Sequence, residues 1–338
     1  MAARTQGLIR AGRLAVALAI AASVIHANGV SGSLAAAGRD VHKDVPDGTQ
    51  VLHAAQRAEA AAQRQAPAVR QAAARRIVSL VPALTEMLFA VGAGPQVIAV
   101  SSYDEFPPEV KALPRVGALL DPDTERILAL RPDLVITYGS QSTQQTQFER
   151  AGIRTFSYRH GGIDTVLETI GELGEATGHT AEAARVVADV RRRLAAVRER
   201  VAKRPRPRVL LVFERQPGTL RELYVSGGSG FLHEMLEIAG GQNVFADLLK
   251  ESVQPSQETL LTRAPDAILE VRAAGMLEPG EVARERGVWS ALPSLPAVRN
   301  QRVHLLSGSY LLVPGPRLAE ATEAFARVLH PDAFPAAR

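Results

Sequence analysis

The chain has 338 residues, of which 46% are hydrophobic, enough to bury a sizeable core in one large or two ordinary domains. It contains no cysteine, which excludes disulfides, cysteine nucleophiles and thiolate metal sites. The formal net charge is +4, but residues 1–75 hold nine Lys/Arg and four Asp/Glu, so residues 76–338 sum to −1 and provide no basic excess for a nucleic-acid partner.

The N-terminus has the pattern of an export signal. Three arginines precede an apolar run at residues 14–25, and small residues follow it. As a helix this run would extend about 18 Å, whereas the hydrocarbon core of a bilayer is about 30 Å thick. We therefore expect a signal peptide over residues 1–27 and a periplasmic protein, with a membrane anchor as the alternative. Residues 28–75 are rich in Ala, Gln and Arg, which is typical of a low-complexity linker.

From residue 76 onward, β-branched apolar runs alternate with helical patterns, which predicts a parallel sheet covered by helices on both faces. A helix of about 25 residues at 179–204 interrupts this pattern, which restarts after Pro205. The predicted strands lie at 76–80, 97–100, 134–137, 153–157, 208–213, 267–271 and 302–306. We expect an α/β fold with two Rossmann-like lobes, 76–178 and 205–338, each with a parallel sheet, bridged by one long helix.

One phrase occurs twice in the chain, as DTERILALRPDLVI and as SQETLLTRAPDAIL, with Glu125 aligned on Glu258. Each copy predicts a capped short helix, a Pro-Asp turn and a buried strand, so the phrase marks a structural unit present in both lobes. A carboxylate in the first helical turn is stabilised by roughly 0.3–1 kcal/mol, so each glutamate can have a structural or a functional role. A second echo, Glu-Met-Leu at 86–88 and at 234–236, supports the duplication.

No catalytic constellation stands out in the sequence. His233 and Glu234 begin an H-E-x-x-H pattern, but Glu237 occupies the place of the second histidine. The GGSGF stretch lacks the final glycine of a G-x-S-x-G elbow. The glycine turn 227–230 precedes a helix and could hold an anion, which leaves an exported enzyme as an alternative class and an exported adhesive protein as a third. We expect no catalytic residues and no metal site.

Aromatic residues follow the predicted strands of both lobes. Tyr103 and Tyr138 follow two strands of the first lobe, and Phe213 and Tyr310 follow two strands of the second. Parallel α/β sheets bind ligands at the carboxyl ends of their strands. Stacking on an aromatic face contributes roughly 0.5–1.5 kcal/mol beyond area burial. The sequence therefore predicts an inter-lobe cleft suited to a large, flat ligand.

Several stretches between residues 76 and 330 resemble the helical-backbone class of periplasmic substrate-binding proteins, which serve ABC importers of cobalamin, haem and ferric siderophores. These stretches are RIVSLVPALTEMLFAVG, SSYDEFPP, ERILALRPDLVI, AGGQNVFAD and VPGPRLAEA. The Ser-Ser-Tyr loop with paired prolines is most similar to the cobalamin-binding members. The resemblance implies a monomer with no intrinsic cofactor that works with an ABC permease, on which Glu125 and Glu258 would dock.

The resemblance also implies a set of ligand-binding residues. Tyr103, Tyr138 and Phe213 match aromatic positions of the family. The segment 309–313 matches a pocket segment, which suggests the ligand contacts Ser309, Tyr310, Leu311 and Val313. Cobalamin is the first expectation for the ligand. Haem is an alternative, with Tyr103 or Tyr310 as axial ligand, and so is a ferric siderophore, for which Arg215 is a candidate.

Overall fold

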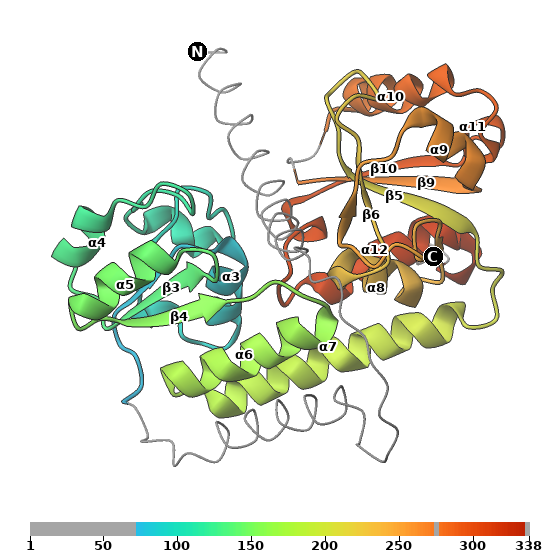
Figure 1. The fold of residues 1–338 in the computed structure, drawn as a ribbon. Helices are drawn as coiled ribbons and strands as arrows, with labels where there is room; N and C mark the ends of the chain where they lie inside the picture. Colours follow the sequence, from blue (N-terminus) through green and yellow to red (C-terminus); the bar gives the residue numbers. More distant parts are fainter. Residues whose placement is uncertain (1–71, 274–276, 335–338) are drawn as a thin grey trace, which may run out of the picture.

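A computed structural model describes residues 72–273 and 277–334 of the chain (Figure 1). Two α/β lobes stand at the two ends of one long helix, α7 (Thr180–Val201) (Figure 1). This arrangement confirms the predicted fold class. No helix within the two described segments is long and apolar enough to span a bilayer.

The N-terminal lobe contains a four-stranded parallel sheet in the order β2-β1-β3-β4. Its strands are β1 (Ile77–Ser79), β2 (Val97–Val100), β3 (Leu134–Tyr138) and β4 (Arg154–Tyr158). Its helices are α3 (Pro82–Ala90), α4 (Thr124–Ala129) and α5 (Ser142–Arg150). Every residue of β1 and β3 is buried, as expected of central parallel strands covered on both faces.

The C-terminal lobe contains a mixed sheet in the order β10-β9-β5-β6-β8, with β7 paired to β5. The parallel strands are β5 (Arg208–Glu214), β7 (Gln242–Asn243), β9 (Ala267–Arg272) and β10 (Val303–Ser307). The antiparallel strands are β6 (Tyr224–Ser226) and β8 (Ser252–Val253). The expected parallel strands are present, and two short antiparallel strands extend the sheet beyond β5. Strands of three and two residues are too short to give a periodic signal in the sequence.

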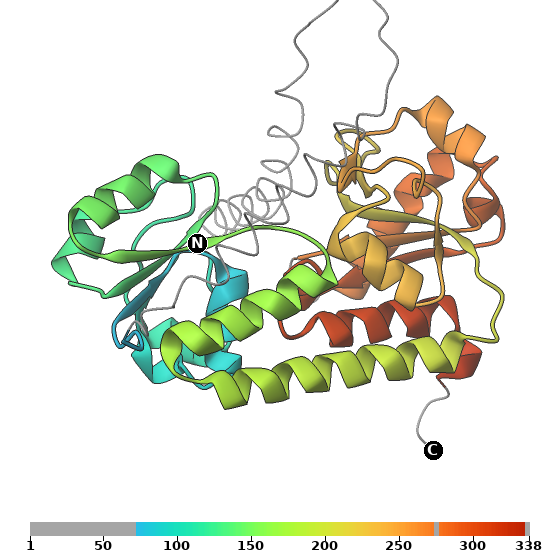
Figure 2. The same ribbon diagram turned by 60° about the horizontal axis from the view of Figure 1, so that its bottom comes forward.

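Helices cover this second sheet and connect it to the rest of the molecule. They are α8 (Gly230–Ile238), α9 (Gln257–Arg263), α10 (Pro279–Gly287), α11 (Pro296–Arg299) and α12 (Leu318–Leu329). Helices α6 (Ile163–Thr177) and α12 pack beside α7 (Figure 2). The helix α7 ends at Val201, three residues before the predicted end at Arg204. The ring of Pro205 disfavours helical backbone in the residue before it, which accounts for part of this difference.

The repeated phrase forms the same hydrogen bonds in both lobes. The Asp133 carboxylate accepts the backbone N–H of Arg76 at 3.0 Å, just before β1. The Asp266 carboxylate accepts the backbone N–H of Arg208 at 3.0 Å, at the start of β5. In each lobe the side chain of the same arginine also donates to a carbonyl at the end of the repeated helix, at 2.7 and 2.6 Å. The Pro-Asp turn therefore aligns two neighbouring strands in each lobe.

In the repeated Glu-Met-Leu sequence, the glutamate of each lobe contacts the other lobe. Glu86 is the fifth residue of α3, and it accepts hydrogen bonds from Nε and Nη2 of Arg317 at 2.8 and 2.6 Å. Glu234 is the fifth residue of α8, and it accepts the backbone N–H of Ile163 at 2.6 Å. Equivalent positions of the duplicated unit thus form reciprocal contacts between the lobes.

Arg215 lies inside the C-terminal lobe and not on a ligand-facing surface. Its side chain is fully buried, with Nε donating to Glu270 at 3.1 Å and Nη2 at 2.9 Å from a Glu285 carboxylate oxygen. Glu270 also accepts from the indole N–H of Trp289 at 3.1 Å and forms an ion pair with Arg272 at 2.5 Å. The geometry gives no support to the expected siderophore contact at Arg215, because its donors are already used within the core.

The loop after β2 is held by a buried carboxyl group. Asp104 accepts a hydrogen bond from the Ser101 hydroxyl at 2.5 Å. Arg115 Nη1 donates to the Ser101 and Asp104 carbonyls, both at 2.8 Å. Burial raises the pKa of Asp104 to about 6. This network fixes the backbone on which Tyr103 is carried.

We predict that Glu270→Ala lowers the free energy of unfolding of the C-terminal lobe by about 3–5 kcal/mol, because it removes the one buried carboxylate that Arg215, Arg272 and the Trp289 indole share. Chemical denaturation of the full-length chain measures this loss. The matched control is Glu323→Ala, which removes an exposed ion pair with Arg327 and should cost about 1 kcal/mol or less. Equal effects of the two substitutions would contradict the assigned role of the buried network.

We predict a second, pH-dependent effect for Asp104→Asn. Because folding raises the pKa of Asp104 from 3.8 to about 6, its stabilising contribution is complete below 3.8 and is lost as the pH rises through 6. The free energy of unfolding of the variant, relative to wild type, should therefore increase by about 2 kcal/mol between roughly pH 4.5 and 7.5. Denaturation across this pH range tests the change, with Asp121→Asn, at an exposed position, as the control substitution.

Candidate functional site

The carboxyl ends of the parallel strands of both lobes face the region between the lobes. Beyond β4, the His160 ring lies 5.5 Å from the ring of Phe231 on α8 of the opposite lobe. Beyond β10, Arg317 reaches Glu86 of the N-terminal lobe. These contacts define an inter-lobe face built from the loops that follow the strands, which is where parallel α/β folds place their ligands.

Two tyrosines close the end of the N-terminal sheet. Tyr138 and Tyr158 are register partners at the last positions of β3 and β4, and their rings meet edge to face at 5.6 Å. The Tyr158 hydroxyl lies 3.4 Å from Nδ1 of His160. Only Tyr138 was among the predicted site residues. The signal that identified it, a tyrosine at a strand exit, applies equally to Tyr158.

Arg317 is the central charged group of the inter-lobe face. Its guanidinium lies 3.9 Å from the ring centroid of Phe106 and 5.7 Å from that of Tyr310. The bidentate contact with Glu86 neutralises its charge. The Phe106 side chain remains 37% exposed. One aromatic ring from each lobe therefore lies near the Arg317 guanidinium, whose charge is balanced by Glu86.

The predicted ligand residues divide into two groups. Tyr103 is half-buried in the loop after β2, while Tyr310 and Ser309 lie next to Arg317, with the Ser309 hydroxyl at 3.4 Å from its Nη2. Val313, in the same segment as Ser309 and Tyr310, is half-buried. By contrast, Phe213 and Leu311 are buried members of the main core, where Phe213 packs on Tyr224 at 6.4 Å. The structure brings the predicted Ser309 and Tyr310 together beside Arg317, and it places Tyr138, Phe213 and Leu311 in the core.

The two phenols and the imidazole with shifted pKa values near this face favour their neutral forms. Burial raises the pKa values of the Tyr158 and Tyr310 phenols above their usual range. Burial lowers the pKa of His160 to about 4, although a Glu251 carboxylate oxygen lies 3.6 Å from its Nε2. Within the described segments, no group of three or more His, Asp or Glu side chains is placed to hold a metal ion. The face therefore presents phenols, rings and a compensated ion pair.

The glycine turn 227–230 has a packing role that accounts for its composition. The backbone N–H groups of Gly227 and Gly228 donate to the carbonyls of Glu251 at 3.2 Å and Leu248 at 2.7 Å. A Cβ atom at either glycine would lie 2.1 Å from a backbone oxygen of the neighbouring segment. Because these two donors are used internally, the geometry gives no support to an anion site for an exported enzyme.

The two repeated glutamates lie on exposed helix starts, one in each lobe. Glu125 is in the first turn of α4, and Glu258 is in the first turn of α9. Each is followed one turn later by an exposed leucine, Leu128 at 37% and Leu261 at 42% exposure. The helices are capped by the side chains of the preceding Asp123 and Ser256. The two lobes thus present the same pair of side chains, a carboxylate and an apolar neighbour.

Comparison with known sequences identifies related proteins. A family model described as periplasmic binding protein matches residues 77–310. A vitamin B12-binding protein of Salmonella typhimurium is 32% identical over 228 residues, covering 67% of this chain and 81% of the relative. A vitamin B12-binding protein of Yersinia pestis is 32% identical over 199 residues, covering 58% and 69%.

Solved structures show the same fold. The periplasmic vitamin B12-binding protein BtuF of Vibrio cholerae has 26% identity and a TM-score of 0.65, covering 78% of this chain and 99% of that chain. A periplasmic haem-binding protein from Pseudomonas aeruginosa has 26% identity and a TM-score of 0.67, covering 78% and 95%. Since the family model matches well over half of the sequence and the structures agree with it, the chain belongs to the periplasmic binding protein family.

Proposed function

We propose that this protein captures cobalamin between its two lobes and delivers it to an ABC permease of the inner membrane. The observation that carries the proposal is the inter-lobe face, where Phe106 and Tyr310 from opposite lobes surround the compensated Glu86–Arg317 pair. Such a face offers ring area and hydrogen-bonding phenols without a net charge, which suits a large, conjugated chelate. The vitamin B12-binding relative at 32% identity supports cobalamin as the ligand.

Haem is a second candidate with its own supporting observation. Tyr103 and Tyr310 place phenol groups in loops that follow strands of the two lobes, and a phenolate is able to bind a haem iron axially. The haem-binding protein from Pseudomonas aeruginosa has a similar fold and sequence. A ferric siderophore has less support, because Arg215 is buried in the C-terminal core.

The permease contact is proposed from the duplicated surface. Glu125 with Leu128 and Glu258 with Leu261 present one carboxylate and one apolar side chain in each lobe. A permease with two-fold symmetry would meet both sites with the same complementary groups. Complementary charges across such a contact increase the association rate and fix its orientation.

We predict saturable binding when the full-length chain is titrated with cyanocobalamin and, in parallel, with haemin. Tyr103→Ala and Tyr310→Ala should each weaken binding of the true ligand by about 1–3 kcal/mol through lost ring area and stacking. The absorbance spectrum of each chelate measures binding directly. Failure of both chelates to bind would contradict the proposed function.

The tyrosine-to-phenylalanine variants distinguish the two ligands. Tyr103→Phe and Tyr310→Phe keep the rings and remove only the hydroxyl groups. If cobalamin is held by stacking, both variants should retain most of the affinity. If haem is held by an axial phenolate, one variant should lose the wild-type haem spectrum as well as affinity.

We predict that Glu125→Ala and Glu258→Ala leave chelate affinity unchanged and weaken association with the reconstituted permease about tenfold or more, which corresponds to about 1.4 kcal/mol. Leu128→Ser and Leu261→Ser should act in the same direction, because they lie on the same exposed faces. The control is Glu168→Ala, an exposed carboxylate on α6. A loss of chelate binding in either glutamate variant would contradict the docking role.

A further inference from the structure

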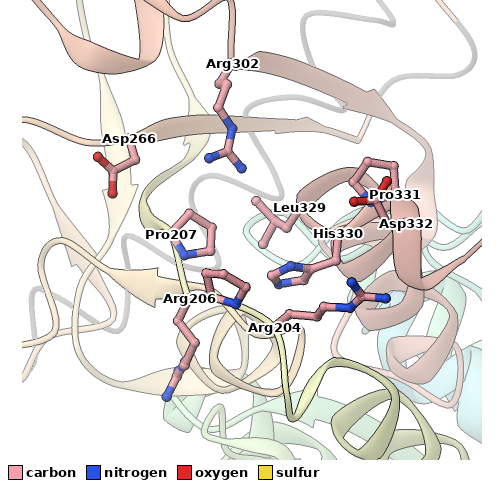
Figure 3. Close-up of a pocket in the computed structure, with 10 residues that line it drawn as sticks. Arg204, Arg206, Pro207, Asp266, Arg302, Leu329, His330, Pro331 and Asp332 are labelled. Carbon is pink, nitrogen blue, oxygen red and sulfur yellow. The ribbon is translucent and has the colours of Figure 1, made fainter.

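A cavity lies at the amino ends of the C-terminal strands, at the opposite edge of the sheet from the inter-lobe face. It has a volume of about 400 Å³ (Figure 3). The connector 204–207 leading from α7 to β5 forms one side, and residues 329–332 after α12 form another. Asp266 and Arg302, which precede β9 and β10, complete the lining. Four chain segments distant in sequence therefore converge on this cavity.

Two arginines that line this cavity have no ion-pair partner among the described residues. Neither Arg204 nor Arg302 forms an ion pair or a side-chain hydrogen bond with a residue of the described segments. Arg206, which also lines the cavity, is bound to Glu237 and donates to the Gly241 carbonyl at 2.6 Å. Arg204 and Arg302 are thus the available cations of the site.

The charges of Arg204 and Arg302 both act on His330. Figure 3 shows Arg302 entering from the β10 side and Arg204 from the connector, with the His330 ring between them in this view. His330 is only 7% exposed, and its Nε2 lies 3.2 Å from the Gly240 carbonyl oxygen. Burial lowers the pKa of His330, and the charges of Arg302 and Arg204 lower it further. The interior of the cavity is therefore electropositive.

The remaining lining indicates what kind of anion the cavity can hold. Pro205, Pro207, Leu329 and Pro331 form an apolar wall. A volume of about 400 Å³ exceeds that of a single inorganic ion and lies within the usual range of roughly 300–1,000 Å³ for small-molecule sites. Two guanidinium groups from separate segments match a group with three acceptor oxygens better than a lone carboxylate, which one guanidinium can hold in a bidentate manner.

We propose that this cavity binds a phosphate monoester, with Arg204 and Arg302 on the phosphate group and the Pro–Leu wall against the organic part. Asp266 and Asp332 border the cavity and disfavour more highly charged polyanions. The Asp266 carboxylate is already engaged by the Arg208 backbone N–H, so it does not compete fully for the arginines. A soluble ester and the headgroup of a phosphatidic-acid lipid both have this chemistry.

Calorimetric titration of the full-length chain with glycerol 3-phosphate tests the proposal, with glycerol as the uncharged reference and ionic strength held constant. We expect saturable binding that weakens at least tenfold in Arg204→Gln and in Arg302→Gln. Arg198→Gln is the matched control, because it removes an exposed cation near the end of α7 that does not line this cavity. Absence of saturable binding, or an equal loss in Arg198→Gln, would overturn the proposal.

The His330 imidazole provides a second readout within the cavity. A bound phosphate offsets the fields of Arg204 and Arg302, so the NMR titration of His330 should move to higher pH on adding glycerol 3-phosphate. The shift should be absent in Arg302→Gln. A His330 titration that does not respond in the wild-type chain would contradict binding at this place, even if the calorimeter shows heat.

Vesicles distinguish the two sources of the phosphate group. Phosphatidylcholine vesicles with and without phosphatidic acid are sedimented with the wild-type chain and with Arg302→Gln. Arg302-dependent sedimentation with phosphatidic acid assigns a lipid headgroup, whereas glycerol 3-phosphate binding without sedimentation assigns a soluble ester. The arginine variants should leave chelate binding unchanged, so this test and the test of the proposed function can fail independently.

Discussion

The relative position of the two lobes depends on a pair of reciprocal carboxylate contacts. Glu86 is 5% exposed and holds Arg317 from the other lobe, while Glu234 holds the backbone N–H at the start of α6. Removing one partner of a buried ion pair leaves an uncompensated charge and costs several kcal/mol. These contacts act in parallel with α7, which joins the lobes covalently. The same guanidinium that fixes the lobes also positions the rings of Phe106 and Tyr310, so lobe alignment and the inter-lobe face have one physical origin.

The two carboxylate contacts between the lobes form a symmetric pair because both lobes contain the same repeated unit. Each lobe contains a nine-residue helix with a glutamate at its fifth position, and each contains a Pro-Asp turn whose carboxylate holds the entry to a neighbouring strand. The first feature acts between the lobes and the second within each lobe. The pairs Glu125–Leu128 and Glu258–Leu261 belong to the same repeated unit, and in both lobes the carboxylate and its neighbouring leucine are exposed. The helix-start position stabilises each carboxylate, and the exposed leucine beside it is the feature on which the proposed permease contact rests.

The fold was largely predictable, because apolar periodicity and Pro/Gly punctuation report directly on buried strands and helix ends. The site was less predictable, because its decisive contacts join residues far apart in the chain. Glu86 and Arg317 are separated by 231 positions, and no local pattern pairs them. Arg215 follows a strand of the second lobe much as Tyr138 ends a strand of the first, but only the structure shows that Glu270 holds it inside the core. Tyr158 could have been found by extending the rule that identified Tyr138.

The cross-lobe contacts also determine how a ligand can bind. A wide opening of the lobes would separate Arg317 from Glu86 and Glu234 from Ile163, which exposes one buried carboxylate and leaves a helix-start N–H without its acceptor. Large hinge motion is therefore costly, and the aromatic face exists before the ligand arrives. A preformed site avoids the cost of ordering loops on binding. Under the proposed function, the spacing between Glu125 and Glu258 would then change little on loading, and a permease would sense the ligand through small shifts at the face.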